Sequence, residues 1–591
     1  MSRPSLRRQC AGTTAILLVL LVLVAIPLLS VLATAVTGYG DDPSALGTLV
    51  DGDMPRIIGN TIFLSVLVVA FSTIMAAPLA FLTSWTGLRR HWWIDIGVMV
   101  PFMTPPFAAA MAWMDITRTG GVIDMLLGDF AGDALRATVN SVWGMGLIMA
   151  CELFPFLYLL LRNCLDAVPA SGTEMAAVVG ASRWKTLTRI VLPQVVGPWS
   201  LGALIVFIRA AGEFGTPVTL GNAIGYQVLV SRIQQDVTVD PLDFSSAAAG
   251  ASALFTLGIA VWALQQVISR RTLDAGGAGA GGRVSRPTSV RLGPVGTIAG
   301  WAWVAVVATM SIIVPYISIV LGATTILRSK APKLDNLSLD YFLIVLSDDR
   351  ALRALTTSAV LAAIGATAGV LIALAVTLVT TLRRSRAAGS APGGRLGRIT
   401  DFLAVAPETV PAIVLAIGFI FFWNAGWLPA TPYNTPAILV IAYAVLFLPM
   451  AVQNIKTSAQ SVTPTVFEAA ATSGATGWHT FARITLPLLL PGIAAGWLLA
   501  FLTGIRELVM SSLVRPSNMT LLSPWIMGQF DQGHRAEAMA MTLIGVVSST
   551  IVLVAVQLWL RRRSVTVDRS PKGPAAQQPT ADGARELSHA G

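Results

Sequence analysis

Long apolar runs recur along the whole chain, and they constrain its fold more than any other feature. An α-helix needs about 20 apolar residues to cross roughly 30 Å of hydrocarbon. The chain is 54% hydrophobic and only 12% charged, whereas soluble domains are closer to a quarter charged. We therefore expect an all-α membrane protein. The predicted spans are 14–37, 57–85, 94–116, 140–162, 195–215, 246–269, 298–327, 354–382, 400–424, 435–455, 488–512 and 538–560.

Basic residues cluster in alternate connections between these spans, as at Arg89-Arg90 and Arg561 to Arg563. The positive-inside bias then predicts that both termini are cytoplasmic. This topology accounts for the net charge of +10. Nucleic-acid binding is a poorer explanation, because the basic residues are scattered over several short loops. The three cysteines and four histidines form no metal-binding or disulfide pattern, so we predict no metal site.

One polar segment occurs twice, 294 positions apart. The sequence EMAAVVGASRWKTLTRIVLP runs from Glu174 to Pro193, and EAAATSGATGWHTFARITLP runs from Glu468 to Pro487. Each copy has two alanines soon after the Glu, a Gly six residues after it, a bulky apolar residue seven beyond the Gly, and a final Leu-Pro. We predict two short helices joined at the Gly, the first beginning with a capping box. One apolar anchor per copy, Leu187 or Phe481, would fill a pocket on a soluble partner.

Each copy lies in a half of the chain with six predicted spans. An even number of spans makes the second half enter the membrane from the same side as the first, so we predict parallel repeats. The predicted boundaries are 1–271 for the first module and 298–563 for the second. A Gly-rich, basic cytoplasmic linker would join them at 272–297, and a disordered cytoplasmic tail would occupy 564–591.

Charged residues inside predicted spans are costly and often functional. We take six of them as candidates for a transport pathway: Glu152, Arg209, Glu213, Glu408, Arg506 and Glu507. Glu213 and Glu507 are expected near the outer ends of their spans, where Arg209 and Arg506 could pair with them. Structural ion pairs, or carboxylates that satisfy nearby backbone, are the alternatives. Prolines in 94–116 and 400–424 are expected to kink these spans around a central passage.

The duplicated segment resembles the Glu-Ala-Ala motif of ATP-binding-cassette importer permeases of the type I, binding-protein-dependent class. The resemblance covers nearly the whole chain and implies about 12 transmembrane helices in two parallel six-helix repeats. Met175 and Leu187 depart from the usual residues of the motif. The resemblance implies that these residues contact the ATPase: Glu174, Ala176, Ala177, Gly180, Leu187, Pro193, Glu468, Ala469, Ala470, Gly474, Phe481 and Pro487.

Two fused modules with Arg506-Glu507-Leu508 are most similar to iron(III) permeases, which implies iron(III) as the cargo. Thiamine, polyamine and phosphonate permeases share much of this pattern and stay as alternatives. The resemblance also implies two copies of a cytoplasmic ATPase, an extracytoplasmic binding protein, and a place in the bacterial cytoplasmic membrane.

The chain has no Gly-x-x-x-x-Gly-Lys-Ser/Thr phosphate loop. We therefore expect no enzyme activity and no bound cofactor in this chain, with ATP and Mg on the partner subunits. An ion-coupled secondary transporter would also show repeats and intramembrane carboxylates, but it does not account for the duplicated segment. A membrane-embedded enzyme lacks a supporting motif, and a structural scaffold would leave the carboxylates unused.

Overall fold

The computed structural model describes residues 3–40, 42–168, 170–276, 290, 292–327, 333–382, 395–460 and 462–567, and every regular element in these ranges is a helix. Nine described helices are long and apolar enough to span a membrane: Gly12–Thr37, Met54–Trp85, Val142–Ala167, Trp184–Ala211, Phe244–Ser269, Pro294–Thr324, Asp349–Thr380, Gly477–Ile505 and Arg535–Leu558. Two bent pairs of helices raise this number to 11. The prediction of an all-α membrane protein is confirmed.

Residues up to Ser549 form one compact unit, and a second begins at Thr550. The first half of the chain contributes α1 (Arg3–Leu20), α2 (Ile26–Thr37), α3 (Met54–Trp85), α4 (Trp93–Met99), α5 (Pro106–Ile116), α6 (Val122–Leu127), α7 (Asp129–Val139), α8 (Val142–Ala167), α9 (Ala170–Val178), α10 (Arg183–Thr186), α11 (Leu192–Ala211), α12 (Leu229–Thr238) and α13 (Phe244–Gly276).

The second half contributes α14 (Pro294–Ala308), α15 (Val314–Thr324), α16 (Asp340–Ser347), α17 (Asp349–Thr377), α19 (Arg395–Val405), α20 (Ala412–Trp423), α21 (Pro436–Leu446), α22 (Leu448–Gln460), α23 (Pro464–Thr472), α24 (Gly477–Thr480), α25 (Leu486–Ile505), α26 (Val509–Leu513), α27 (Leu522–Asp531) and α28 (Arg535–Val567). Helices α13 and α28 extend into the predicted linker and tail, most of which lie outside the described residues.

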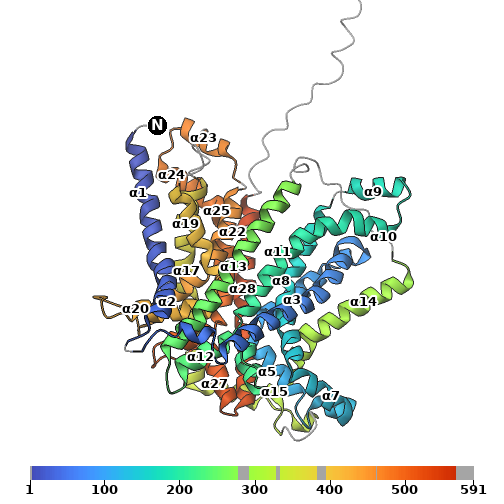
Figure 1. The fold of residues 1–591 in the computed structure, drawn as a ribbon. Coiled ribbons are helices and arrows are strands. Elements are labelled where there is room, and N and C mark those ends of the chain that lie inside the picture. The colour runs from blue at the N-terminus through green and yellow to red at the C-terminus, as the bar shows by residue number, and fades with distance from the viewer. Residues whose placement is uncertain are drawn as a thin grey trace, which may run out of the picture. The chain divides into compact units, whose positions relative to one another are not determined.

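Each half packs its leading helices on the opposite half. Helices α1 and α2 contact α19 and α20, while α14 and α15 contact α3 and α5 (Figure 1). A serine hydroxyl faces a backbone carbonyl of the opposite half at both crossings. Ser318 Oγ donates to the Ala112 carbonyl at 2.6 Å, and Ser30 Oγ shares its hydrogen between the Pro27 carbonyl of its own helix at 2.6 Å and the Gly418 carbonyl at 3.2 Å. This exchange ties the two halves together.

Four spanning helices contain a π-turn just before an X-Pro pair: η1 (Leu21–Ala25), η5 (Leu187–Val191), η7 (Thr309–Ile313) and η11 (Phe481–Thr485). Proline lacks an N–H and clashes with the carbonyl four residues before it. A π-turn shifts the preceding bond to the fifth residue back, as in Leu192 N–H to Leu187 O and Leu486 N–H to Phe481 O. The helix therefore continues through Pro193 and Pro487, which lie in the first turn of α11 and α25.

The predicted spans 94–116 and 400–424 are broken rather than kinked. In the first, α4 is followed by η4 (Pro101–Met103) and then by α5. In the second, α19 and η10 (Ala406–Glu408) meet α20 at an angle of 111°. Pro105 and Pro411 precede α5 and α20 in extended conformation, with ψ of 134° and 139°. Backbone N–H and C=O groups that such a break leaves unpaired inside a membrane must bond to other parts of the protein or face a water-filled cavity.

Candidate functional site

A cavity of about 280 Å³ lies where the two broken spans meet α8 and the ends of α11 and α25. Its wall includes Pro101 and Pro106 from the first break, and Pro407 and Pro411 from the second. The structure brings all six charged candidates from the sequence to this cavity: Glu152, Arg209, Glu213, Glu408, Arg506 and Glu507. Their part in transport stays a prediction.

Glu213 and Glu507 cap the helical turns that follow them. Glu213 accepts hydrogen bonds from the backbone N–H groups of Gly215 at 2.7 Å and Thr216 at 3.1 Å. Glu507 accepts from Met510 at 2.8 Å and Ser511 at 2.9 Å. The first N–H groups of a helix have no partner inside it and favour negative charge. The possible pairing of these carboxylates with Arg209 and Arg506 is not found, because both arginines have other partners.

The two arginines instead connect opposite halves of the chain. Arg209 Nη2 lies 3.9 Å from Glu408 Oε1, and its guanidinium lies 4.4 Å from the Phe156 ring centroid. Arg506 donates to the carbonyls of Phe102 and Thr104, which the helix break leaves free, and covers the Phe102 ring at 4.6 Å. Phe102 and Phe156 meet edge to face at 5.3 Å.

Phe102 and Phe156 were not among the sequence candidates. Their only signal was proximity to Thr104-Pro105-Pro106 and to Pro155, and neither phenylalanine has an aromatic counterpart in the second half. The offset of 294 aligns Phe156 with Met450, and the offset of 306 that relates Pro105 to Pro411 aligns Phe102 with Glu408. Met450 and Glu408 also line the cavity. The cavity wall is therefore asymmetric although the helices around it are repeated.

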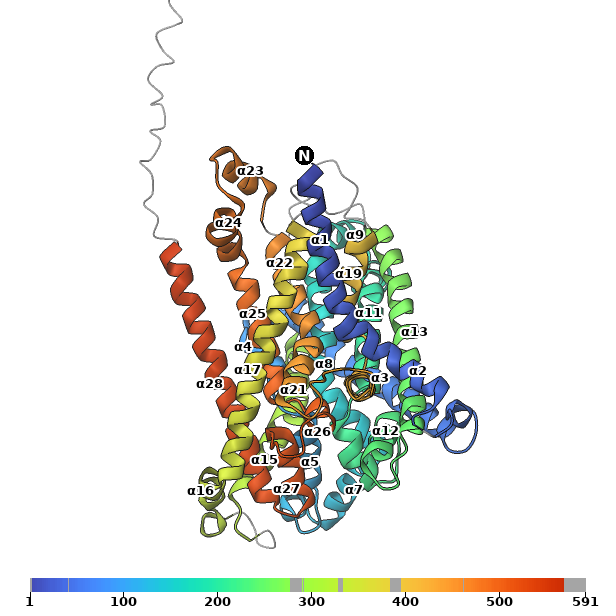
Figure 2. The same cartoon turned by 90° about the vertical axis from the view of Figure 1, so that its left-hand side faces the viewer.

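The duplicated segments form matching pairs of short helices, α9 with α10 and α23 with α24. Gly180 and Gly474 make the turns with φ of +73° and +71°, a conformation that other residues adopt with strain. The same closing bond follows, from Ala181 N–H to Ala176 O at 2.9 Å and from Ala475 N–H to Ala470 O at 3.0 Å. Both segments lie at the same end of the compact unit (Figures 1 and 2).

The predicted capping boxes are absent. Helix α9 begins at Ala170, before Ser171, and α23 begins at Pro464 after Thr463. Glu174 and Glu468 therefore lie beyond the first turn, and both are exposed. Helix α23 begins at Pro464 because the fixed φ of proline suits the first helical position and its missing N–H is not needed there.

The side chains of the segments divide into buried and exposed positions. Ala176 and Ala470 are buried, and the anchors predicted from sequence, Leu187 and Phe481, are half-buried in the π-turns. Gly180, Gly474, Pro193, Pro487 and Ala469 are exposed, whereas the side chain of Ala177 lies outside the described residues.

A tryptophan protrudes at the same position of each segment. Trp184 and Trp478 are 72% and 73% exposed. Sequence analysis missed this pair, although both copies carry Trp four residues after the Gly. Large exposed aromatic side chains are typical of interaction surfaces.

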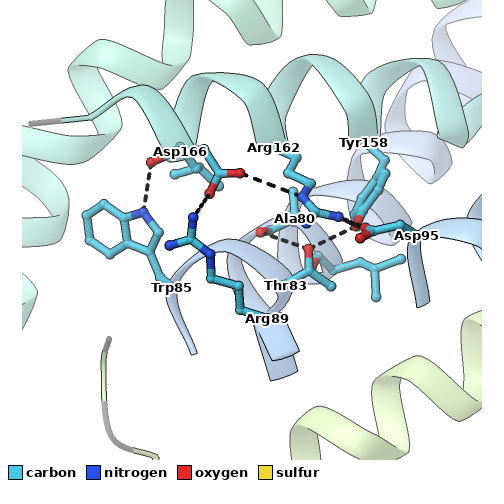
Figure 3. A network of polar contacts seen from close by, with 10 residues as sticks. Ala80, Thr83, Trp85, Arg89, Asp95, Tyr158, Arg162 and Asp166 are labelled. Atoms are coloured by element: carbon cyan, nitrogen blue, oxygen red, sulfur yellow. Dashed lines mark hydrogen bonds and ion pairs between the residues drawn. The ribbon is translucent and has the colours of Figure 1, made fainter. Parts of the chain in front are cut away.

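A matched ion pair joins each broken span to the helix that leads into the duplicated segment. Arg162 of α8 pairs with Asp95 of α4, and Lys456 of α22 lies 2.8 Å from Asp401 of α19. Figure 3 shows that Arg162 belongs to a wider network: Tyr158 also donates to Asp95, while Asp166 lies 3.8 Å from Arg162 and 3.7 Å from Arg89. Ion pairs thus connect the helices between the cavity and the duplicated segment in both halves.

Comparison with known proteins reveals the same duplication. Residues 78–274 and 383–565 each match the sequence profile of the family described as "Binding-protein-dependent transport system inner membrane component". The "Putative ferric transport system permease protein FbpB 1" of Haemophilus influenzae is 23% identical over 76% of this chain and 68% of its own length. The "Fe(3+)-transport system permease protein FbpB 2" of the same organism is also 23% identical, over 80% of this chain and 83% of its own length.

A similar relative is the "Ferric transport system permease protein FbpB" of Actinobacillus pleuropneumoniae, which is 21% identical over 85% of this chain and 71% of its own length. The "Sulfate transport system permease protein CysT" of Escherichia coli is 24% identical over 28% of this chain and 58% of its own length.

Proposed function

Because the chain belongs to the family of binding-protein-dependent transport system inner membrane components, we propose that it forms the translocation pathway of an importer driven by two separate ATPase subunits. The observation that carries this proposal is the pair of matching docking segments at one end of the compact unit, each joined to a helix of the central cavity. An ATPase pair is the partner that two equivalent segments fit. ATP and Mg would be bound by those subunits.

The docking segments would lie in the cytoplasm, with both termini on that side of the bacterial cytoplasmic membrane. The distribution of Arg and Lys supports this orientation. The exposed residues Glu174, Gly180 and Pro193, with their counterparts in the second copy, would form the contact surface together with Trp184 and Trp478. Ala176 and Ala470 are buried and would lie beneath that surface. An extracytoplasmic binding protein would deliver cargo at the opposite end.

Iron(III) is the cargo that we propose, because three relatives that cover most of this chain are described as ferric permeases. The cavity supports a cationic cargo, since its wall carries four carboxylates and two guanidiniums. Thiamine, a polyamine or a phosphonate would be the competing cargo.

Uptake into liposomes tests this function. The chain is reconstituted with its ATPase subunits and binding protein, and radioactive iron(III), thiamine, spermidine and a phosphonate are supplied outside in separate experiments. We expect iron uptake that requires internal ATP and both partners. Uptake of another cargo in place of iron would refute the assignment of iron(III) but not the transport function. Uptake driven by a proton or sodium gradient without the ATPase would indicate a secondary transporter instead.

A further inference from the structure

Helix α22 carries a stripe of uncharged polar side chains that leads from the central cavity toward the second docking segment. The wall of the cavity includes Pro449 and Met450 of this helix. Gln453 and Thr457 follow about one and two turns later on the same face, and both are exposed. They lie within the bent pair α21–α22, which is long and apolar enough to span a membrane. Because polar groups are costly in contact with lipid, we expect this face to line a water-filled space.

The contacts of Gln453 identify this space as the passage between the two halves. Its side-chain amide donates a hydrogen bond to Glu408 Oε2, and Glu408 Oε1 lies 3.9 Å from Arg209 Nη2 of the first half. Glu408 and Arg209 both line the central cavity. One turn further along, Thr457 Oγ1 donates to the Gln453 carbonyl of its own helix at 2.8 Å, and a hydroxyl oxygen that donates in this way can still accept from a guest. The stripe therefore begins at the cavity, where the halves meet.

An open groove of about 340 Å³ lies beside this stripe, between α22 and α25. Its wall contains Gln453, Asn454, Thr457, Ser458, Pro491, Gly492 and Ala495. The two helices are close at Gly492, where a Cβ atom would lie 2.3 Å from Ser458 Oγ and 2.5 Å from the Asn454 carbonyl oxygen. A glycine therefore lets α25 pack against the polar side of α22. The four polar side chains of the wall are all uncharged.

The repeated fold does not require polar residues in this stripe. Helix α8 packs on α11 as α22 packs on α25, and the ion-paired residues Arg162 and Lys456 are 294 positions apart. The same offset aligns Gln453, Asn454 and Ser458 with Leu159, Leu160 and Cys164. Leu159 is 42% exposed, so this position is open in both halves but polar only in the second. The polar side chains of α22 therefore serve something other than the packing of the repeat.

Amide and hydroxyl groups suit the release of a polar cargo from the charged cavity. Both kinds of group can donate and accept hydrogen bonds, so they replace part of the water around a cargo of either charge. Hydrogen bonds between neutral groups are about half as strong as those that involve a charged group. A transport pathway must bind its cargo weakly enough for the cargo to leave. A step from the carboxylates of the cavity to the neutral groups of α22 meets this requirement.

We propose that the cargo leaves the central cavity along the second half of the chain, past Glu408 to Gln453 and Thr457, and that the uncharged polar side chains of α22 solvate it there. The first half, with Leu159 at the matching position, forms the apolar side of the same exit. This inference rests on the proposed transport function and adds the route by which a strongly hydrated cargo reaches the cytoplasm.

Exchange of second-half residues for their first-half counterparts tests this route. The triple variant Gln453→Leu, Asn454→Leu, Ser458→Cys carries side chains that α8 already accommodates, and thermal unfolding checks that it folds. It is reconstituted in liposomes with its ATPase subunits and binding protein. Uptake of radioactive iron(III), or of the cargo that the wild type takes up in its place, is measured per ATP hydrolysed. We expect this ratio to fall at least about fivefold through loss of hydrogen-bonding groups along the route, while ATP hydrolysis and ATPase binding stay unchanged.

Two single variants complete the test. Thr457→Val removes one hydroxyl with little change of shape and should lower uptake per ATP by about twofold or more, so it decides the matter if the triple variant does not fold. Leu159→Gln is the reverse exchange in the first half and should transport within about twofold of the wild type.

Wild-type uptake per ATP in both Thr457→Val and the folded triple variant would overturn the inference. Recovery of the triple variant by addition of Leu159→Gln would also overturn it, because polarity on either side of the passage would then be sufficient. A wild type without ATP-dependent uptake of any of the four cargoes would contradict the proposed function instead.

Discussion

Truncation of the protruding tryptophans provides the sharpest test of the docking segments. A tryptophan buries about 150–250 Å² when enclosed, and 73% of Trp478 is available in the free chain. About 110–180 Å² could thus be buried by a partner, worth about 3–4.5 kcal/mol at ~25 cal/mol per Å². Ordering the side chain opposes this by about 0.5–1.5 kcal/mol. We expect Trp478→Ala to weaken ATPase binding by about 1.5–4 kcal/mol, or about tenfold to nearly a thousandfold.

The assay is the dissociation constant of the purified ATPase subunit for the chain in detergent micelles. Trp184→Ala should have a similar effect, because Trp184 is 72% exposed at the equivalent position. Trp427→Ala is the control, since Trp427 is 70% exposed but lies between α20 and α21, away from both segments. Each substitution should leave thermal unfolding nearly unchanged, because exposed side chains contribute little to folding.

Unchanged ATPase binding by the double variant Trp184→Ala, Trp478→Ala would refute the assignment of these segments as docking surfaces. A loss of affinity in Trp427→Ala as large as that in Trp478→Ala would also refute it, because the effect would then not depend on the segment. A truncation of Phe481 that weakens binding more than Trp478→Ala would identify the anchor predicted from sequence as the dominant contact.

Two further predictions concern ionisable groups. Lys456→Ala should lower the unfolding free energy by about 1 kcal/mol, because Asp401 loses a partner 2.8 Å away in a partly buried pair. Lys456→Arg should retain most of this stabilisation. Equal unfolding temperatures for Lys456→Ala and wild type would contradict the role of this pair. Asp236 lies in α12, outside the spanning helices, where burial raises its carboxyl pKa to about 6, Arg232 opposes the rise and Asp243 adds to it. The folded state therefore binds the proton more tightly, so the stabilisation from this group is complete below about pH 4 and is lost as the pH rises through 6. Asp236→Asn should therefore reduce the change in unfolding temperature between pH 4 and 7. Wild-type and Asp236→Asn curves of unfolding temperature against pH that run parallel would show that Asp236 does not titrate in this window.

The sequence alone identified the helical membrane class, the duplication, and the six charged residues around the cavity. These features are local. The length of an apolar run determines whether it can span the membrane, and a charged residue within such a run usually faces the protein interior because contact with lipid is costly. The glycine turns at Gly180 and Gly474 were also predictable, because a sharp reversal after a short helix needs positive φ.

Tertiary structure decided which partners those residues have. Glu213 and Glu507 are close in sequence to Arg209 and Arg506, yet free N–H groups of the next helical turn bind the carboxylates and the arginines cross to the opposite half. Likewise, the leading helices pack on the opposite halves through Ser30 and Ser318, and the prolines break two spans rather than kink them. Hydropathy records how much of a segment is apolar but not which neighbour buries it, so contacts between distant segments are fixed only when all helices are packed together.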